Sequence, residues 1–248
     1  GVQNWNEIEA LLERGITKPI APRHLKTAPH KEVIQKGDAV DLFKLPVPMS
    51  SIYDGGPMIT AGVVIAKDPE FGLNSGMYRF MVKEKNLDIV TPNNMRLFAQ
   101  RAYEAGRPCP ISISIGTHPF EIMGSGFRAP LGVDEMGIAG GIRGAPVDLV
   151  SCETIDMPCI ADAEIVLEGE ILPTGWVYPE GRFGEFTRLM GGLHWNPQVR
   201  INAVTMRRDA MYYALHMPWE NTWLAAPTRY NAIRRALKTA GVQVKDIN

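Results

Sequence analysis

Glu180 and Glu185 stand five residues apart, in a segment that also contains Gly181 and Gly184. At this spacing the two side chains would diverge on a helix and would point to opposite faces on a strand. We therefore expect a bent backbone, which the glycines allow because glycine adopts positive φ without steric cost. Two convergent carboxylates could perform acid–base chemistry, whereas on an exposed turn they would be no more than solvated surface groups.

Arg79 is the second residue whose type stands out from its surroundings. It lies in a predicted strand over 74–82, where it shares one face with Met77 and Met81 while its neighbours on the other face are also apolar. A buried guanidinium needs a counter-charge. Arg79 therefore predicts either a structural ion pair or a site for an anion.

The elements that must position these residues are mostly strands. Residues 58–66 form a continuous apolar run, typical of a strand buried on both faces, and residues 110–116 alternate between apolar and polar types. Further strands are predicted over 147–154, 163–170, 199–206 and 211–215. Helices are predicted from Trp5 to Gly15, from Thr91 to Gly106 and from Thr228 to Gly241, with short helical stretches over 120–123 and 134–139. This pattern favours an α+β fold in which helices surround an antiparallel barrel or sandwich.

The balance of charge argues against two classes of partner. The chain has 26 basic and 27 acidic residues, so we expect no nucleic-acid partner and no membrane-binding face. No apolar run reaches the roughly 20 residues of a membrane span, and the first residues lack the features of a signal peptide, so the sequence predicts a cytoplasmic protein. Three cysteines without metal-type spacing predict neither a disulfide framework nor a zinc site.

The order of several short motifs is specific. They are Asp54-Gly55-Gly56-Pro57, Ile59-Thr60-Ala61-Gly62, Asn74 with Tyr78-Arg79, Gly132-Val133-Asp134-Glu135, Arg143 to Val147, Ala163 to Gly169, and Glu180 to Glu185. In this order they resemble the UbiD family of reversible decarboxylases, which use prenylated FMN (prFMN). The resemblance extends from about residue 37 to residue 218.

The resemblance implies a split β-barrel, similar to flavin-binding barrels, within the α+β fold. It also implies a catalytic triad of Arg79, Glu180 and Glu185, in which Arg79 binds the substrate carboxylate beside the flavin and Glu185 donates a proton to the carbon that has lost CO₂. A carboxyl group beside a second carboxylate would have a raised pKa, which suits an acid. Arg182, where the family often has proline, adds a positive charge that would lower the pKa of either glutamate.

The same resemblance implies a cofactor site and a metal site. The positions implied to bind prFMN are Asn74, Met77, Tyr78, Arg79, Asn93 and Glu135. Those implied to bind the divalent ion that holds its phosphate, usually Mn²⁺ with K⁺ nearby, are Asn74, Asn94 and Glu135. Because asparagine stands where the family typically has histidine, the ligand set is all oxygen and suits Mg²⁺ at least as well.

We therefore expect reversible, non-oxidative decarboxylation of an aromatic, heteroaromatic or α,β-unsaturated carboxylic acid. The partners implied are that small-molecule acid, CO₂, a flavin prenyltransferase that makes the cofactor, and further copies of the chain in a homo-oligomer, a dimer or hexamer. Two alternatives remain open. One is a non-catalytic flavin-binding or scaffold subunit of a multi-subunit carboxylase, and the other is a hydrolase acid pair of the glycosidase kind, which would leave Arg79 unexplained.

Members of the family are longer than this chain, which predicts that the chain is the central part of a longer protein. We expect residues 1–45 to form an N-terminal helix and a proline-rich loop that belong to an N-terminal lobe. Residues 46–216 are expected to form the split-barrel domain that binds the cofactor and carries the triad. Residues 217–248 are expected to form a linker and the start of a C-terminal region.

Overall fold

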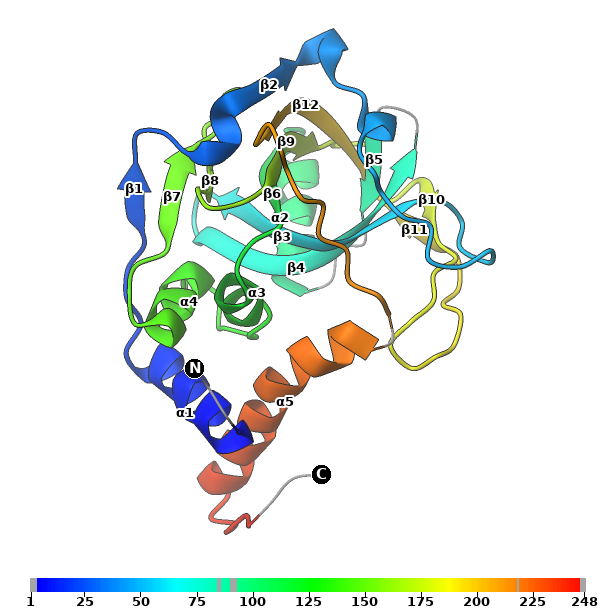
Figure 1. Ribbon diagram of the computed structural model, residues 1–248. Coiled ribbons are helices and arrows are strands. Elements are labelled where there is room, and N and C mark those ends of the chain that lie inside the picture. Colours follow the sequence, from blue (N-terminus) through cyan, green and yellow to red (C-terminus); the bar gives the residue numbers. More distant parts are fainter. Residues whose placement is uncertain (1–3, 84–85, 90–92, 218, 246–248) are drawn as a thin grey trace.

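A seven-stranded antiparallel sheet organises the protein (Figure 1). The computed structural model describes residues 4–83, 86–89, 93–217 and 219–245. In spatial order the strands are β2 (Val33–Lys36), β12 (Gln198–Met206), β5 (Asn86–Ile89), β4 (Gly72–Lys83), β3 (Met58–Asp68), β6 (Cys109–Ile115) and β9 (Ile165–Ile171). β12 also pairs with β9, so the sheet curls until strands from its two sides meet.

Two smaller sheets accompany it in the part of the chain that the structure describes. β1 (Arg23–Leu25) runs parallel to β7 (Asp148–Ser151), and β7 pairs antiparallel with β8 (Pro158–Ile160). β10 (Tyr178–Glu180) and β11 (His194–Asn196) form an antiparallel pair of their own. In the curled sheet β12 meets β5 over only two residue pairs, so the ring of strands is uneven rather than a regular barrel.

The helices lie at the periphery, which confirms the predicted α+β class. In the described part of the chain they are α1 (Trp5–Thr17), α2 (Asn93–Glu104), α3 (Pro119–Ser125), α4 (Glu135–Arg143) and α5 (Trp219–Thr239), with short 3₁₀ turns η1 (Pro29–Glu32), η2 (Gly37–Ala39) and η3 (Leu42–Lys44). α3 and α4 pack beside β3 and β4, whereas α1 and α5 lie together at the end farthest from the sheet (Figure 1). Within the described residues, no helix has the length and apolarity needed to cross a bilayer.

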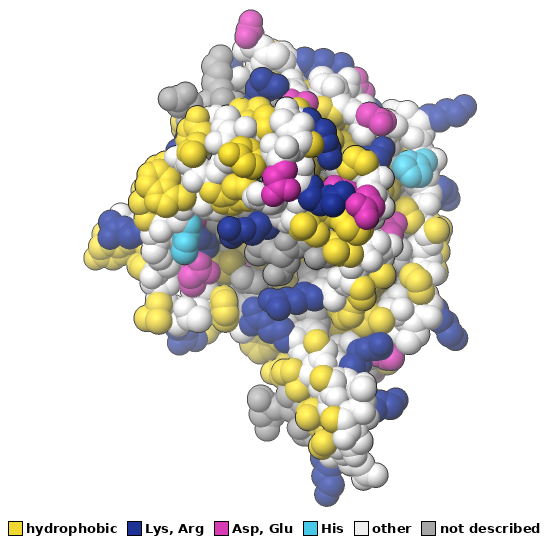
Figure 2. Space-filling model, turned by 180° about the vertical axis from the view of Figure 1, so that it is seen from behind, with side chains coloured by type: hydrophobic (Ala, Val, Ile, Leu, Met, Phe, Trp, Pro, Cys, Tyr) yellow, Lys and Arg dark blue, Asp and Glu magenta, His cyan; other side chains and the backbone are white. Residues whose placement is uncertain are grey.

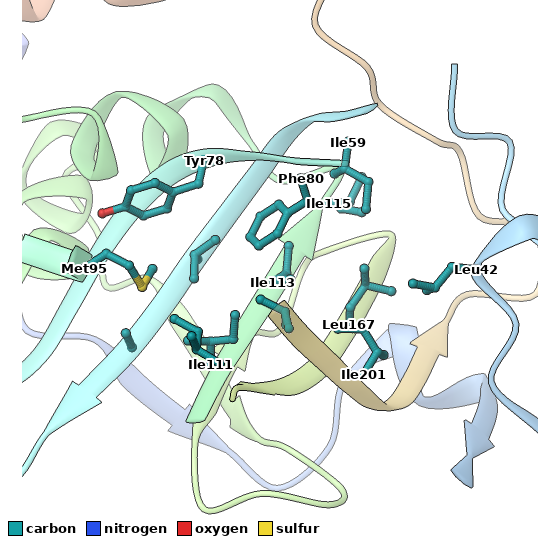
Figure 3. Packing of buried hydrophobic residues seen from close by; sticks show 14 of the residues in the cluster. Leu42, Ile59, Tyr78, Phe80, Met95, Ile111, Ile113, Ile115, Leu167 and Ile201 are labelled. Atoms are coloured by element: carbon teal, nitrogen blue, oxygen red, sulfur yellow. The ribbon is translucent and has the colours of Figure 1, made fainter. Parts of the chain in front are cut away.

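The main core lies inside the curled sheet. β3 explains the continuous apolar run at 58–66, because Val64 joins the inner core while its neighbour Val63 packs on the other side, toward α3 and α4. Figure 3 shows Phe80 of β4 and Ile113 of β6 pointing toward each other in this inner core. The prediction of a strand buried on both faces is therefore confirmed.

The strand predicted over 211–215 is wrong. The backbone N–H of Met211 donates to Glu164 Oε2 at 3.1 Å, and that of Leu215 donates to Thr60 Oγ1 at 2.8 Å. Side chains therefore accept these two backbone hydrogen bonds, where a paired strand would use the carbonyls of its neighbour.

The predicted start of the last helix is also wrong. α5 begins at Trp219, and Thr228 lies inside it with its hydroxyl donating to the Ala225 carbonyl at 2.9 Å instead of capping a first turn. The preceding Pro227 resembles a helix boundary in sequence, but the helix continues through it. The cap predicted for α2 at Thr91 lies outside the described residues.

Glu121 of α3 is a buried carboxyl that makes stability depend on pH. Its side chain is 1% exposed, and Arg143 Nη1 lies 4.0 Å from its Oε1. Burial raises the pKa of Glu121 to about 7, although the charge of Arg143 acts in the opposite direction. The folded protein therefore keeps this proton to a higher pH than the unfolded chain does. The contribution of the bound proton to the free energy of unfolding is fully present below about pH 4.5 and is lost as pH rises toward 7.

We predict that Glu121→Gln removes this part of the pH dependence. Between pH 5 and pH 8 the free energy of unfolding of the variant should fall less than that of the wild type, by on the order of 2 kcal/mol. Urea unfolding at the two pH values measures the difference. The exposed Glu104→Gln on α2 is the control, and an equal pH response in all three proteins would contradict the assignment.

Candidate active site

The glutamates of the predicted site lie at the end of β10 and in the loop that follows. β10 pairs with β11 so that Glu180 stands opposite His194, which fixes where the loop begins. Gly181 adopts a φ of 109°, so it makes the bend that its residue type predicts. Gly184 does not act in this way, because its φ is outside the left-handed region and a Cβ there would meet only the sulfur of Met190, at 3.8 Å.

Arg79 joins the two carboxylates. Its Nε donates to Glu180 Oε1 at 3.0 Å and its Nη2 to Glu180 Oε2 at 3.3 Å, while its Nη1 donates to Glu185 Oε1. Glu180 also accepts from Asn196 Nδ2 at 3.4 Å. The guanidinium carbon of Arg79 lies 4.8 Å from the centroid of the Phe183 ring. The structure thus brings Arg79, Glu180 and Glu185 together around one guanidinium.

Burial distinguishes the two glutamates. The Glu180 side chain is fully buried, whereas 31% of the Glu185 side chain is exposed. Burial by itself would lower the pKa of Arg79, but the hydrogen bonds and charges of Glu180 and Glu185 raise it. Arg79 therefore keeps its charge, Glu180 is held in place, and Glu185 is the more accessible of the two glutamates.

A β-bulge lies opposite Arg79. β3 and β4 pair Ile59 with Phe80 and then Gly62 with Tyr78, so two residues of β3 face one residue of β4. Such a bulge increases the local twist of a strand pair and redirects the side chains beside it. The irregularity therefore coincides with the position whose guanidinium organises the site.

A second loop holds the glutamate loop in place. The N–H of Gly55 donates to the Arg182 carbonyl at 2.8 Å, and the N–H of Gly184 donates to Asp54 Oδ1 at 3.2 Å. The backbones approach so closely that a Cβ on Gly55 would lie 1.8 Å from the carbonyl oxygen of Gly181. The sequence shows a turn at Asp54-Gly55 but gives no sign of what it contacts.

A cavity of about 280 Å³ lies beside Arg79 and Glu185. Its lining residues are Thr60, Met77, Tyr78, Arg79, Glu185, Phe186, Met217, Asn221 and Arg229. The lining residues contributed by α5 could not be found from the sequence, because nothing in their local pattern shows that this helix reaches β4. On the face seen in Figure 2 the surface is hollowed near its middle, and charged side chains border the hollow.

A second cavity, of about 380 Å³, lies along the same strand. It is lined by Asn74, Ser75, Gly76, Met77, Tyr78, Ser125, Gly126, Phe127, Arg128, Ala129 and Glu135. Met77 and Tyr78 line both cavities, so β4 connects them. A Cβ on Gly76 would lie 2.5 Å from the Tyr78 ring, so the absence of a side chain at Gly76 is required here.

Asn74 and Glu135 meet in the second cavity. Asn74 Nδ2 donates to Glu135 Oε1 at 2.7 Å, and the N–H of Ser75 donates to Glu135 Oε2 at 2.8 Å. Burial raises the pKa of Glu135 to about 7, against the effect of these two hydrogen bonds. Within the described residues, Asn74 Oδ1 and Ser75 Oγ are buried without a hydrogen-bond partner.

This arrangement provides oxygen atoms that could coordinate a cation. Two buried, unpartnered oxygens beside a carboxylate fit the all-oxygen coordination of Mg²⁺ or Mn²⁺. The described part of the chain has no cluster of three His, Cys, Asp or Glu side chains arranged for a metal, so amide or hydroxyl oxygens would have to contribute. The side chains of Asn93 and Asn94 lie outside what the structure describes.

Residues 23–218 match the family pattern described as UbiD, the 3-octaprenyl-4-hydroxybenzoate carboxy-lyase Rift-related domain. The chain belongs to the UbiD family. The resemblance carried by the ordered motifs is therefore confirmed.

Solved structures support the same assignment. The UbiD-class enzyme HmfF from Pelotomaculum thermopropionicum, in an evolved dimeric form with prFMN, superposes with a TM-score of 0.90 at 36% identity, over 95% of this chain and 56% of that one. Apo 3,4-dihydroxybenzoic acid decarboxylase (AroY) from Klebsiella pneumoniae gives a TM-score of 0.87 at 31% identity, over 94% of this chain and 52% of that one.

One curated relative is named as a decarboxylase. The anhydromevalonate phosphate decarboxylase of Methanothermobacter thermautotrophicus is 34% identical over 84% of this chain and 49% of its own length. The chain thus spans about half the length of the relatives it matches.

Arg182 contributes to this UbiD-family site mainly through its backbone. Its side chain is exposed, and its carbonyl accepts the hydrogen bond from Gly55. Among the described residues, the ion pairs of Glu180 and Glu185 are formed with Arg79. A free pair of acids, as a glycosidase would need, is not what the geometry presents.

We predict that Gly55→Ala displaces the glutamate loop. The added methyl group cannot share space with the Gly181 carbonyl, so the free energy of unfolding should fall by about 1–3 kcal/mol. Gly192→Ala is the matched control, because a Cβ there meets nothing within 4 Å and should change stability far less. Urea unfolding compares the two variants. Equal losses of stability would show that there is room for a Cβ at Gly55 beside the Gly181 carbonyl.

Proposed function

We propose that this chain forms the catalytic core of a prFMN-dependent decarboxylase, acting in either direction on an aromatic, heteroaromatic or α,β-unsaturated carboxylic acid. The observation that carries the proposal is Arg79 held between a buried Glu180 and an accessible Glu185 on the wall of a cavity. Membership of the UbiD family supports it, as does the prFMN bound to HmfF.

The chain's own residues fit the cofactor. Asn74, Met77, Tyr78, Arg79 and Glu135 line the two cavities beside β4 and would hold prFMN along this strand, with Asn93 as a further predicted contact. The unpartnered oxygens of Asn74 and Ser75 would join Glu135 in holding a divalent cation at the phosphate end, with Asn94 as the remaining predicted ligand and K⁺ nearby.

When bound, prFMN supplies the electron sink that loss of CO₂ requires. Arg79 presents a planar set of donors to the cavity, which suits binding of a substrate carboxylate. Glu180, fully buried and bonded to both Arg79 and Asn196, fixes the orientation of that guanidinium. Glu185 lines the cavity and is positioned to deliver a proton to the substrate carbon, which is general acid catalysis.

Partners follow from this proposal. The reaction would consume a small carboxylic acid and release CO₂, and the protein would depend on a flavin prenyltransferase for its cofactor. We further propose a homo-oligomer, in keeping with the evolved dimeric form described for HmfF.

We predict that Glu185→Gln lowers the turnover number by about 10²–10⁴-fold while the bound flavin keeps its absorbance, because an amide is not acidic enough to transfer a proton to carbon. Turnover of a panel of aromatic and α,β-unsaturated acids, measured on protein co-expressed with a flavin prenyltransferase, tests this. Glu70→Gln, which alters an exposed glutamate elsewhere, should retain full activity. Unchanged turnover in Glu185→Gln would refute the acid role, and wild-type protein that binds no flavin would instead support a scaffold subunit.

We also predict that Mn²⁺ stabilises the protein through Glu135. At a free concentration one hundred times its dissociation constant the metal should add about 2.7 kcal/mol to the free energy of unfolding. Glu135→Gln should remove this gain, whereas Glu121→Gln, another buried glutamate with a raised pKa, should preserve it. Thermal unfolding with and without MnCl₂ provides the measurement, and equal stabilisation of all three proteins would rule out this site.

A further inference from the structure

Arg229 is a second cation in the cavity that contains Arg79. It comes from α5, and its guanidinium carbon lies 4.7 Å from the centroid of the Phe186 ring in the glutamate loop. Among the described residues it forms no ion pair with a carboxylate, and its side chain is exposed. The aromatic face supports the guanidinium but does not neutralise its charge.

The two arginines of the cavity therefore differ in their counter-charges. The positive charge of Arg79 is matched by Glu180 and Glu185, which bind it directly. The charge of Arg229 has no such match among the described residues, although both arginines line the same space. A substrate whose one carboxylate lies at Arg79 would leave Arg229 without an anionic partner among the described residues.

Asn221 lies two turns before Arg229 on α5 and also lines the cavity. Its Nδ2 donates to Met217 Sδ at 2.9 Å, which leaves its second amide hydrogen for another acceptor. α5 thus presents to the same cavity an amide donor and a guanidinium that has no carboxylate partner in the described part of the chain. These are the donors that recognise carboxylate and phosphate groups.

We propose that Arg229 and Asn221 form a subsite for a second anionic group on the substrate, a carboxylate or a phosphate distant from the carboxylate that is lost. This assignment rests on the proposed function and makes it more specific. The substrate would then be a dianion, with one end at Arg79 and the other at α5.

Binding of three probe anions tests the subsite. Isothermal titration of the flavin-loaded protein with benzoate, benzene-1,4-dicarboxylate and 4-phosphonobenzoate compares one monoanion with two molecules that carry a second anionic group. The wild type should bind at least one of the latter about tenfold more tightly than benzoate, a difference of about 1.4 kcal/mol. The probe with the larger preference identifies the second group as carboxylate or phosphate.

Substitutions of Arg229 test whether this residue causes the tighter binding of probes that carry a second anionic group. Arg229→Gln should lose it while binding benzoate within about twofold of the wild type, and Arg229→Lys should keep part of it because the charge remains. Arg208→Gln removes an exposed arginine that does not line the cavity and should behave as the wild type.

Three results would overturn the proposal. They are a wild type that prefers neither probe to benzoate, a preference that persists in Arg229→Gln, and an equal loss of benzoate binding in that variant. The last result would mean that Arg229 only holds Phe186 in place. Because these measurements need no turnover, they remain distinct from the Glu185→Gln experiment on catalysis itself.

Discussion

A buried positive charge is stable in a fold only where the fold also supplies negative charge, and Arg79 imposes this condition on the chain. Arg79 sits within β4, but its partners follow it by 101 and 106 positions. The β10–β11 hairpin must therefore lie beside β4, and Lys83 helps by donating to the Pro179 carbonyl. Phe183, between the glutamates, packs with Met58 and Met81, so apolar burial and ion pairing hold the same loop.

Part of this arrangement could be predicted because physical chemistry restricts the alternatives. A continuous apolar run such as 58–66 needs cover on both faces, and β3 has it. An arginine among apolar neighbours needs a counter-charge wherever it lies in the chain, and Glu180 and Glu185 provide it. Gly181 could be assigned to a bend because its residue type and its position between two carboxylates agree.

The rest depended on contacts that leave no local trace. Gly15 resembles the end of a helix, but α1 continues to Thr17, and the glycine lets α1 approach α4, where a Cβ would lie 2.7 Å from the Ile138 carbonyl. Thr228 resembles a cap, but it is a buried interior residue of α5. Asn74 and Glu135 could be paired only through the family resemblance, since 61 residues separate them.

The bulge in β3 connects the charged cluster to the helix on the other side of the cavity. Thr60 lies in the bulge, lines the cavity, and accepts a hydrogen bond from the Leu215 backbone. A paired strand at 211–215 would have extended the sheet, whereas this side-chain contact lets the chain turn toward α5. Phe186 then stacks against Arg229, so the glutamate loop, the bulge and α5 enclose one space. The counter-charge that Arg79 requires and the charge of Arg229, which has no carboxylate partner among the described residues, are thereby brought to the same cavity by different parts of the fold.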